Sequence, residues 1–256
     1  MKPLYLQGRP GLAVTLEEPA LSVHAPGRAP RLYPLARVSR VIASGPVQWS
    51  TEALMACAER GITVSFLHTD GRVRAYLLGE TTGRAALYQR LRDLLDRPDW
   101  PALYADWYRA MDSLGRRALL KRLGLDPLIA LPAPRLLRQL AGLKACHANP
   151  RVLDFIERRL DGLCRALAVE LLAAAGIGAE RAATLDARLD LPGDLARLLG
   201  WDLHLPLLAW LERQPAARPV ADAALVALFE SRIRRLRRIG RYLVQRLYVW
   251  LLDLPG

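Results

Sequence analysis

The chain has 256 residues, of which 52% are apolar, enough to bury one large hydrophobic core or two modest ones. This composition excludes a disordered chain. Lys and Arg number 37 against 25 Asp and Glu, which leaves a net charge of +12, nearly all of it from Arg. Such a charge attracts polyanions and Arg suits forked contacts to phosphate, so it favours a nucleic-acid partner. The alternative is a GC-rich genome that replaces Lys by Arg on solvated faces.

The cysteines indicate the compartment. Cys57, Cys146 and Cys164 are odd in number and widely spaced, which fits reduced thiols better than a disulfide or zinc framework. No apolar core of signal-peptide length follows Met1, and no uncharged apolar run is long enough to span a bilayer. We therefore expect a cytoplasmic protein.

The first part of the chain is predicted to be β-rich. Short apolar runs at 4–6, 12–16, 21–24 and 31–35 are separated by Gly- and Pro-containing turns, the spacing of a meander or small sandwich.

The stretch from 37 to 78 has the order strand, helix, strand, hairpin. A β-branched run at 38–42 stops at Gly45-Pro46, and Ser50 or Thr51 can cap a short helix over 53–58. An apolar strand at 62–67 then meets a hairpin turn at 69–71.

The same stretch resembles a known family. The run Gly45-Pro46-Val47-Gln48-Trp49-Ser50-Thr51, followed by Glu59-Arg60-Gly61-Ile62 and Val64-Ser65-Phe66-Leu67, resembles the signature of the CRISPR adaptation integrase, the universal first Cas protein. The likeness in order and spacing covers most of residues 4–90. Pro46 stands where the family has Asn, and Thr63 where it has Pro.

The resemblance implies a function and partners. Family members are metal-dependent DNA endonucleases and integrases that acquire spacers for CRISPR antiviral defence. They form homodimers through the N-terminal sheet and bridge to a small second Cas protein. These are the partners that we expect here, together with DNA.

From residue 84 onward the pattern becomes helical, with apolar residues every three or four positions. We expect an α+β protein with a β-rich domain at 1–83, which the resemblance implicates in dimerisation, and a helical domain at 84–256. Helices are predicted at 85–95, 102–123, 136–145, 149–176 and 219–252, with a linker at 128–134. Asn149 is the expected cap of the fourth helix, and apolar residues form a stripe along the last one.

The resemblance also implies a metal site in the helical domain, where the family holds Mg²⁺ or Mn²⁺ with a Glu, a His and an acidic residue. The family Glu lies in a segment of the form Leu-x-Gly-Ile-Glu-Gly, and the best counterpart here is Leu140 to Ala145, which places Lys144 at the carboxylate position. The family His has no counterpart in 178–184. Asp190 alone matches the acidic ligand, so we expect the metal chemistry to be lost and no cofactor to be bound.

A displaced site is the alternative. Asp202 and His204 would lie on the same side of an extended segment, where a metal could be shared with Glu157 or Glu170. Against this, a His beside Trp and Pro is commonly structural. The neighbours Cys146 and His147 would point about 100° apart on a helix, which disfavours a nucleophilic pair.

Two basic clusters are the predicted DNA-binding surface. They lie near the end of the 102–123 helix and in the middle of the last helix: Arg116, Arg117, Lys121, Arg122, Arg232, Arg234, Arg235, Arg237, Arg238 and Arg241. The alternatives are a favourable interaction with the helix dipole for the first cluster, and a solvated or acid-paired face for the second. Tyr242 and Tyr248 are candidates to stack on a nucleotide.

Three hypotheses follow. The first is a CRISPR adaptation protein that binds DNA without the metal-dependent chemistry. The second is an active DNA endonuclease and integrase with relocated ligands and Mg²⁺ or Mn²⁺. The third is a structural or regulatory DNA-binding protein that uses the same fold outside spacer acquisition.

Overall fold

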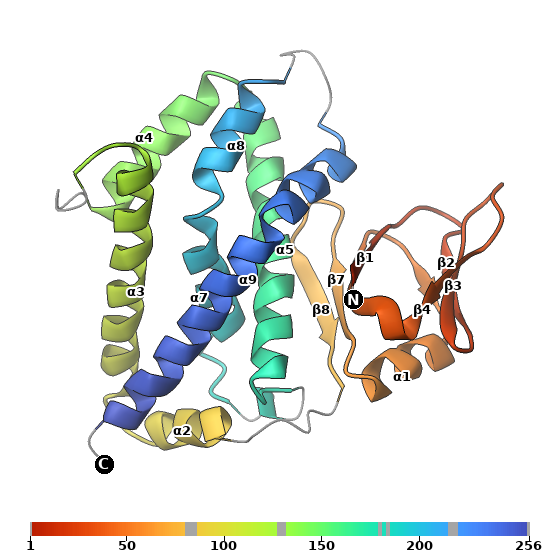
Figure 1. The fold of residues 1–256 in the computed structure, drawn as a ribbon, viewed down its shortest axis with the longest axis horizontal. Helices are drawn as coiled ribbons and strands as arrows, with labels where there is room; N and C mark the ends of the chain where they lie inside the picture. The colour runs from red at the N-terminus through yellow and green to blue at the C-terminus, as the bar shows by residue number, and fades with distance from the viewer. Residues whose placement is uncertain are drawn as a thin grey trace.

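The computed structural model describes residues 2–79, 86–126, 132–178, 181–182, 185–214 and 220–254. Strands occupy the N-terminal part and helices the remainder, which confirms the predicted α+β class (Figure 1). The predicted domain boundary at residue 84 and most of the predicted linker at 128–134 lie outside these ranges. Within them, no helix is both long and apolar enough to cross a membrane.

The strands form two four-stranded sheets. The first has the order β1-β5-β7-β8, with β1, β5 and β7 parallel and β8 antiparallel to β7: β1 (Lys2–Gln7), β5 (Val38–Ser44), β7 (Thr63–Leu67) and β8 (Val73–Leu77). The second has the order β4-β3-β2-β6: β4 (Arg31–Pro34), β3 (Ala20–His24), β2 (Ala13–Glu17) and β6 (Gln48–Trp49). Its first three strands form a meander from three of the four predicted runs, whereas the run at 4–6 lies in the first sheet.

The first sheet has a different neighbour on each face, because side chains alternate along a strand. Val41 and Ala43 of β5 pack with the second sheet and with helix α1 (Thr51–Glu59). Ile42, between them, packs against the helices of the C-terminal part. The predicted cap of α1 is confirmed, since the Ser50 side chain accepts a hydrogen bond of 3.2 Å from the backbone N–H of Ala53.

The helical part is built around α5. Its helices are α2 (Ala86–Leu95), α3 (Trp100–Arg122), α4 (Ala133–Ala145), α5 (Pro150–Ala174), α7 (Leu191–Gly200), α8 (His204–Leu211) and α9 (Asp222–Asp253). The predicted Asn cap of α5 is confirmed, because Asn149 Oδ1 accepts a 3.0 Å hydrogen bond from the N–H of Val152. In Figure 1, α5 lies between the first sheet and α7, and α9 crosses this layer diagonally.

Two glycines let the sheet approach α5 closely. A Cβ on Gly71, in the turn between β7 and β8, would lie 2.4 Å from the Cα of Arg159. A Cβ on Gly162 would lie 2.1 Å from the carbonyl oxygen of Gly71. Gly71 also has a φ of +90°, a conformation that L side chains rarely adopt. Side chains at either position would push the hairpin away from the helix.

A buried ionic network joins the sheet to the helices. Arg40, on the face of β5 that meets α5, donates hydrogen bonds of 2.7 Å to Glu170 and 3.2 Å to the Tyr5 hydroxyl. Glu170 accepts a second hydrogen bond, of 2.8 Å, from Arg237 of α9. This network is not among the features predicted from the sequence, although an Arg inside a β-branched run is itself a signal of a buried ionic partner.

Candidate functional site

Lys144 occupies the end of α4 and is buried, with 3% of its surface exposed. Its ammonium group donates a 2.6 Å hydrogen bond to Glu157 Oε1 on α5, and this carboxylate is about half exposed. The positive charge at the end of α4 therefore lies against α5, where the partly exposed carboxylate of Glu157 neutralises it. Burial removes the hydration shell of an ammonium group, which costs free energy. The ion pair with Glu157 offsets this cost and allows Lys144 to be buried.

Lys144 and Glu157 line a cavity of about 360 Å³ between α4, α5, α7 and α8, which we call the Lys144 cavity. Asp161, Cys164, Arg197 and His204 also contribute to its wall, among apolar side chains. Burial first, and then the charge of Lys144, lower the pKa of His204 to about 3. His204 is therefore a neutral ring at physiological pH, and it packs 5.4 Å from the ring of Trp201.

The residues of the Lys144 cavity do not fit a divalent cation. A cation such as Mg²⁺ needs several oxygen ligands, and an ammonium group beside them would repel it. The described residues contain no group of three His, Cys, Asp or Glu side chains with the geometry to hold a metal ion. Glu157 directs a carboxylate oxygen at Lys144, so this oxygen is already paired with a positive charge of the protein itself.

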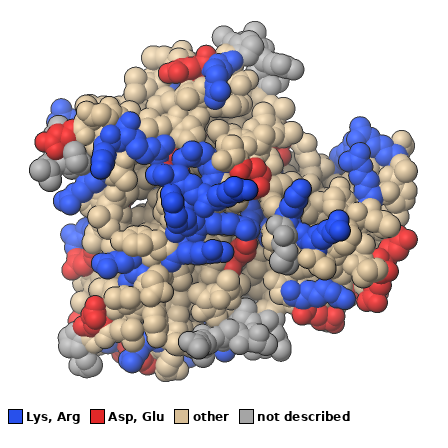
Figure 2. All heavy atoms as spheres, in the orientation of Figure 1, with Lys and Arg blue, Asp and Glu red and all other residues tan. Residues whose placement is uncertain are grey.

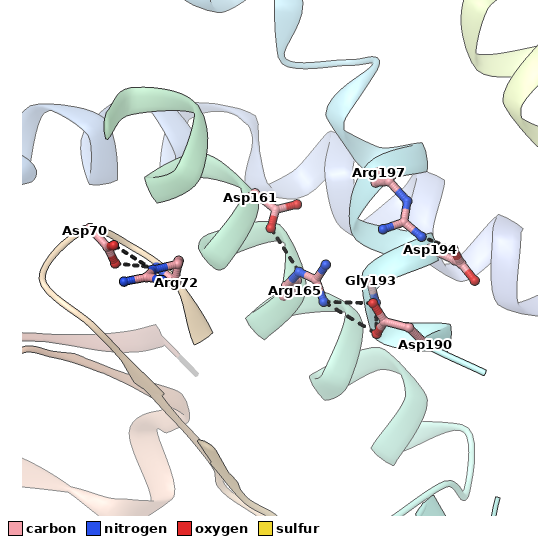
Figure 3. A network of polar contacts seen from close by, with 8 residues as sticks. All are labelled: Asp70, Arg72, Asp161, Arg165, Asp190, Gly193, Asp194 and Arg197. Carbon is pink, nitrogen blue, oxygen red and sulfur yellow. Dashed lines mark hydrogen bonds and ion pairs between the residues drawn. The ribbon is translucent and has the colours of Figure 1, made fainter. Parts of the chain in front are cut away.

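Asp190 lies at the start of α7 and has two structural roles (Figure 3). Its carboxylate caps the helix by accepting a 3.0 Å hydrogen bond from the N–H of Gly193. It also pairs at 3.1 Å with Arg165 of α5, whose guanidinium group reaches Asp161 at 2.9 Å. Figure 3 shows Arg165 between the two carboxylates, so it links α5 to the beginning of α7. Asp190 is not among the residues that line the Lys144 cavity.

The expectation of an extended segment holding Asp202 and His204 on one side is wrong. Asp202 lies in a turn, and His204 begins α8. Pro206 falls in the first turn of that helix, where its missing N–H is not needed. His204 faces the Lys144 cavity, whereas the buried Asp202 carboxylate accepts from three guanidinium groups.

The three partners of Asp202 come from two helices. Arg122 of α3 donates at 2.7 Å, and Arg232 and Arg235 of α9 donate at 3.1 and 2.6 Å. We call these four residues the Asp202 cluster. Three positive charges face one negative charge, so the cluster retains an excess of positive charge at the junction of α3 and α9.

The structure divides the predicted DNA-binding residues into two sets. Five have carboxylate partners, since Arg116 pairs with Asp112 at 2.9 Å and Arg237 with Glu170, in addition to the three arginines of the Asp202 cluster. The others are exposed and have no carboxylate within ion-pair distance in the described ranges: Arg117, Lys121, Arg234, Arg238 and Arg241.

The exposed arginines of α9 share one side of the helix. Arg234, Arg238 and Arg241 recur at spacings of four and three residues, so they form one stripe, which we call the α9 basic face. Figure 2 shows Lys and Arg side chains gathered over the middle of the side of the molecule that α9 crosses in Figure 1. Tyr242 is exposed next to this stripe, whereas Tyr248 packs against the hydrophobic core.

Comparisons with known proteins give one family profile and several solved structures. The sequence profile described as "CRISPR associated protein Cas1" matches residues 4–130. A search of curated protein sequences gives no match.

Solved structures give matches over nearly the whole chain. A Cas1 protein from Thermotoga maritima superposes with a TM-score of 0.76 at 11% identity, over 98% of this chain and 97% of that one. A casposase bound to integration product gives 0.61 at 12% identity, over 96% and 91%. TtCas1 in complex with DNA gives 0.52 at 18% identity, over 99% and 97%. Residues 4–130 match the family of the CRISPR associated protein Cas1, and the shared fold extends through the helical part.

Proposed function

We propose that this protein is a Cas1 adaptation protein that binds DNA through the α9 basic face and the end of α3, and that it lacks metal-dependent cleavage and joining. The observation that carries this proposal is the buried ammonium group of Lys144, paired with Glu157 at 2.6 Å beside the neutral ring of His204.

Exposed positive charge without carboxylate partners in the described ranges supports the proposed DNA binding. Arg234, Arg238 and Arg241 project from one side of α9, and the Asp202 cluster adds further positive charge. An Arg stripe releases condensed counterions when it contacts phosphates, and this release drives binding regardless of base sequence. Two structural relatives are described as bound to DNA or to an integration product, which is consistent with the same use of this fold.

The residues at the candidate metal-ligand positions support the proposed loss of metal-dependent chemistry. Lys144 stands at the position that the family resemblance gives to a carboxylate, and Asp190 caps a helix while it pairs with Arg165. A charged Lys cannot donate a lone pair to a metal. Asp202, a ligand in the hypothesis of relocated chemistry, is occupied by three arginines. No feature of the described residues favours that hypothesis over loss of the chemistry.

The partners follow from the family. We include a homodimer formed through the β-rich N-terminal region, which we treat as a domain ending near residue 84, and a complex with the small second Cas protein. Light scattering on a size-exclusion column measures the first, and co-elution with that protein measures the second. A strictly monomeric chain would remove the dimer from the proposal.

The proposal is tested by measuring DNA binding and cleavage in the same samples. Labelled branched DNA is titrated with the protein in EDTA, Mg²⁺ or Mn²⁺, and both anisotropy and nicked product are recorded. We expect DNA binding in all three buffers, steep weakening of that binding with salt, and no nicked product above background. Metal-dependent nicking would contradict the proposed loss of metal chemistry. Binding that does not respond to salt would contradict the proposed contacts between the arginines and DNA phosphates.

A further inference from the structure

A second cavity lies where α3 meets α9, separate from the Lys144 cavity. It has a volume of about 200 Å³, and its lining comes from α3, the end of α7 with the turn after it, and α9. We call it the Tyr242 pocket. The pockets that take drug-sized ligands usually measure roughly 300 to 1,000 Å³, so this one suits a smaller, flat group.

The walls of the Tyr242 pocket are apolar and aromatic. Trp201, Leu119 and Ile239 contribute apolar surface, and Tyr242 stands at the opening with 52% of its surface exposed. Gly115 lets the Trp201 ring lie against α3, because a Cβ on this glycine would be 2.7 Å from Trp201 Cδ1. The indole is fixed in place, since its N–H donates a 2.8 Å hydrogen bond to Asp112.

The rim of the Tyr242 pocket is positively charged. Arg122, Arg235 and Asp202 belong both to this lining and to the Asp202 cluster. Arg235 contacts Asp202 through Nε, and its two terminal nitrogens have no hydrogen-bond partner in the described ranges. Burial lowers the pKa of Arg122, and the neighbouring Arg235 and Arg232 act in the same direction while Asp202 opposes them. An additional anion would therefore stabilise these crowded, positively charged guanidinium groups.

An aromatic, apolar pocket with a cationic rim matches the two halves of a nucleotide. A base has a π-face that stacks on aromatic side chains, and its phosphate attracts guanidinium groups. A base inside a duplex is paired and stacked on its neighbours, so an unpaired base enters a pocket at the lowest cost.

We infer that the Tyr242 pocket binds one unpaired nucleobase of a DNA strand that crosses the α9 basic face, with the adjoining phosphate held by Arg122 and Arg235. This inference rests on the proposed DNA binding and adds to it a site that recognises a base. The α9 basic face holds the phosphates of any DNA, and the pocket makes the protein favour DNA with an unpaired, intact base.

The test compares two DNA molecules with the same phosphates. One is a duplex with a short single-stranded tail of thymidines, and the other carries abasic sites throughout that tail. Fluorescence anisotropy gives the affinity of the protein for each. We expect the thymidine tail to bind about tenfold more tightly, within the range that one stacked base contributes.

Four variants show whether the preference comes from the pocket. Tyr242→Leu removes the exposed ring and Ala118→Phe fills the opening, and both should abolish the preference for bases. Tyr242→Phe keeps the ring, and Ala105→Phe adds the same side chain at another exposed position of α3, so both should retain it.

The outcomes separate this inference from the proposed function. If the protein binds both tails equally well, or if the preference survives Ala118→Phe, the Tyr242 pocket does not bind a base, although the protein binds DNA. If the protein binds neither DNA, the proposed function itself fails and the inference fails with it.

Discussion

The Lys144 cavity and the α9 basic face place positive charge in opposite settings. In the cavity, a single ammonium group is buried and is neutralised by the carboxylate of Glu157. On α9, three guanidinium groups of one stripe face solvent without carboxylate partners in the described ranges. Buried and paired charge organises the protein, whereas exposed and unpaired charge is available for a partner. A cluster of basic residues in a sequence cannot be assigned to either role until its partners are known.

The largest expected effect comes from the α9 basic face. We expect replacement of Arg234, Arg238 and Arg241 by Ala to weaken duplex DNA binding by up to about 500-fold near 0.1 M salt, because each lost phosphate contact removes about 0.9 from the salt slope. Anisotropy titrations at several salt concentrations measure both quantities.

A triple variant of equal charge is the matched control. Arg72, Arg90 and Arg188 are exposed and lie beside Asp70, Asp93 and Asp186, so their replacement by Ala also removes three positive charges. We expect the control to change the salt slope little. Equal losses in the two triple variants would mean that net charge, and not the α9 basic face, determines binding.

A smaller effect is expected from the ion pair in the Lys144 cavity. Glu157→Leu leaves the buried ammonium of Lys144 without its carboxylate, and we expect a loss of about 2 kcal/mol in the free energy of unfolding, below the 3–5 typical of a fully buried pair because Glu157 is half exposed. Lys144→Met removes the charge while it keeps the length of the side chain, and it should change stability by less than about 1 kcal/mol.

Urea unfolding of both variants measures this difference. If Lys144→Met is the more damaging of the two, the ammonium group stabilises the protein in some way other than as a charge that Glu157 must neutralise.

The third effect concerns His204. Its pKa is about 3 in the folded protein, against an ordinary value near 6.5 in the unfolded chain. Between these values the unfolded chain binds the proton and the folded one does not, so stability falls as the pH is lowered from 6.5 towards 3. The expected contribution is about 1.4 kcal/mol for each pH unit.

His204→Phe keeps a ring against Trp201 and removes this titration. Urea unfolding at pH 7, 6 and 5 should show a shallower loss of stability in the variant than in the natural protein. Parallel pH profiles would mean that His204 takes up its proton over the same pH range in the folded and the unfolded protein.

The sequence predicted features that depend on neighbouring residues. The caps at Ser50 and Asn149, the hairpin turn at Gly71 and the apolar stripe of α9 follow from short patterns, and the structure contains each of them. The family signature between 45 and 67 also lies within one short stretch of chain.

The features that the sequence did not predict depend on distant residues. Arg40 meets Glu170 across 130 positions, and Asp202 meets Arg122 across 80. Asp202 was a candidate metal ligand on the basis of its spacing from His204, but the turn and helix there direct the two side chains to different sites. Spacing along the chain predicts proximity only when the type of secondary structure is known.

The central claim is that the ammonium group of Lys144 takes the place of a metal ion, and Mn²⁺ binding tests it most directly. The electron paramagnetic resonance signal of free Mn²⁺ is recorded as protein is added, with the natural chain and with Lys144→Glu. We predict that the natural chain leaves the signal unchanged and that Lys144→Glu, which places a carboxylate beside Glu157 and His204, reduces it. Stoichiometric loss of the free Mn²⁺ signal with the natural chain would contradict the account.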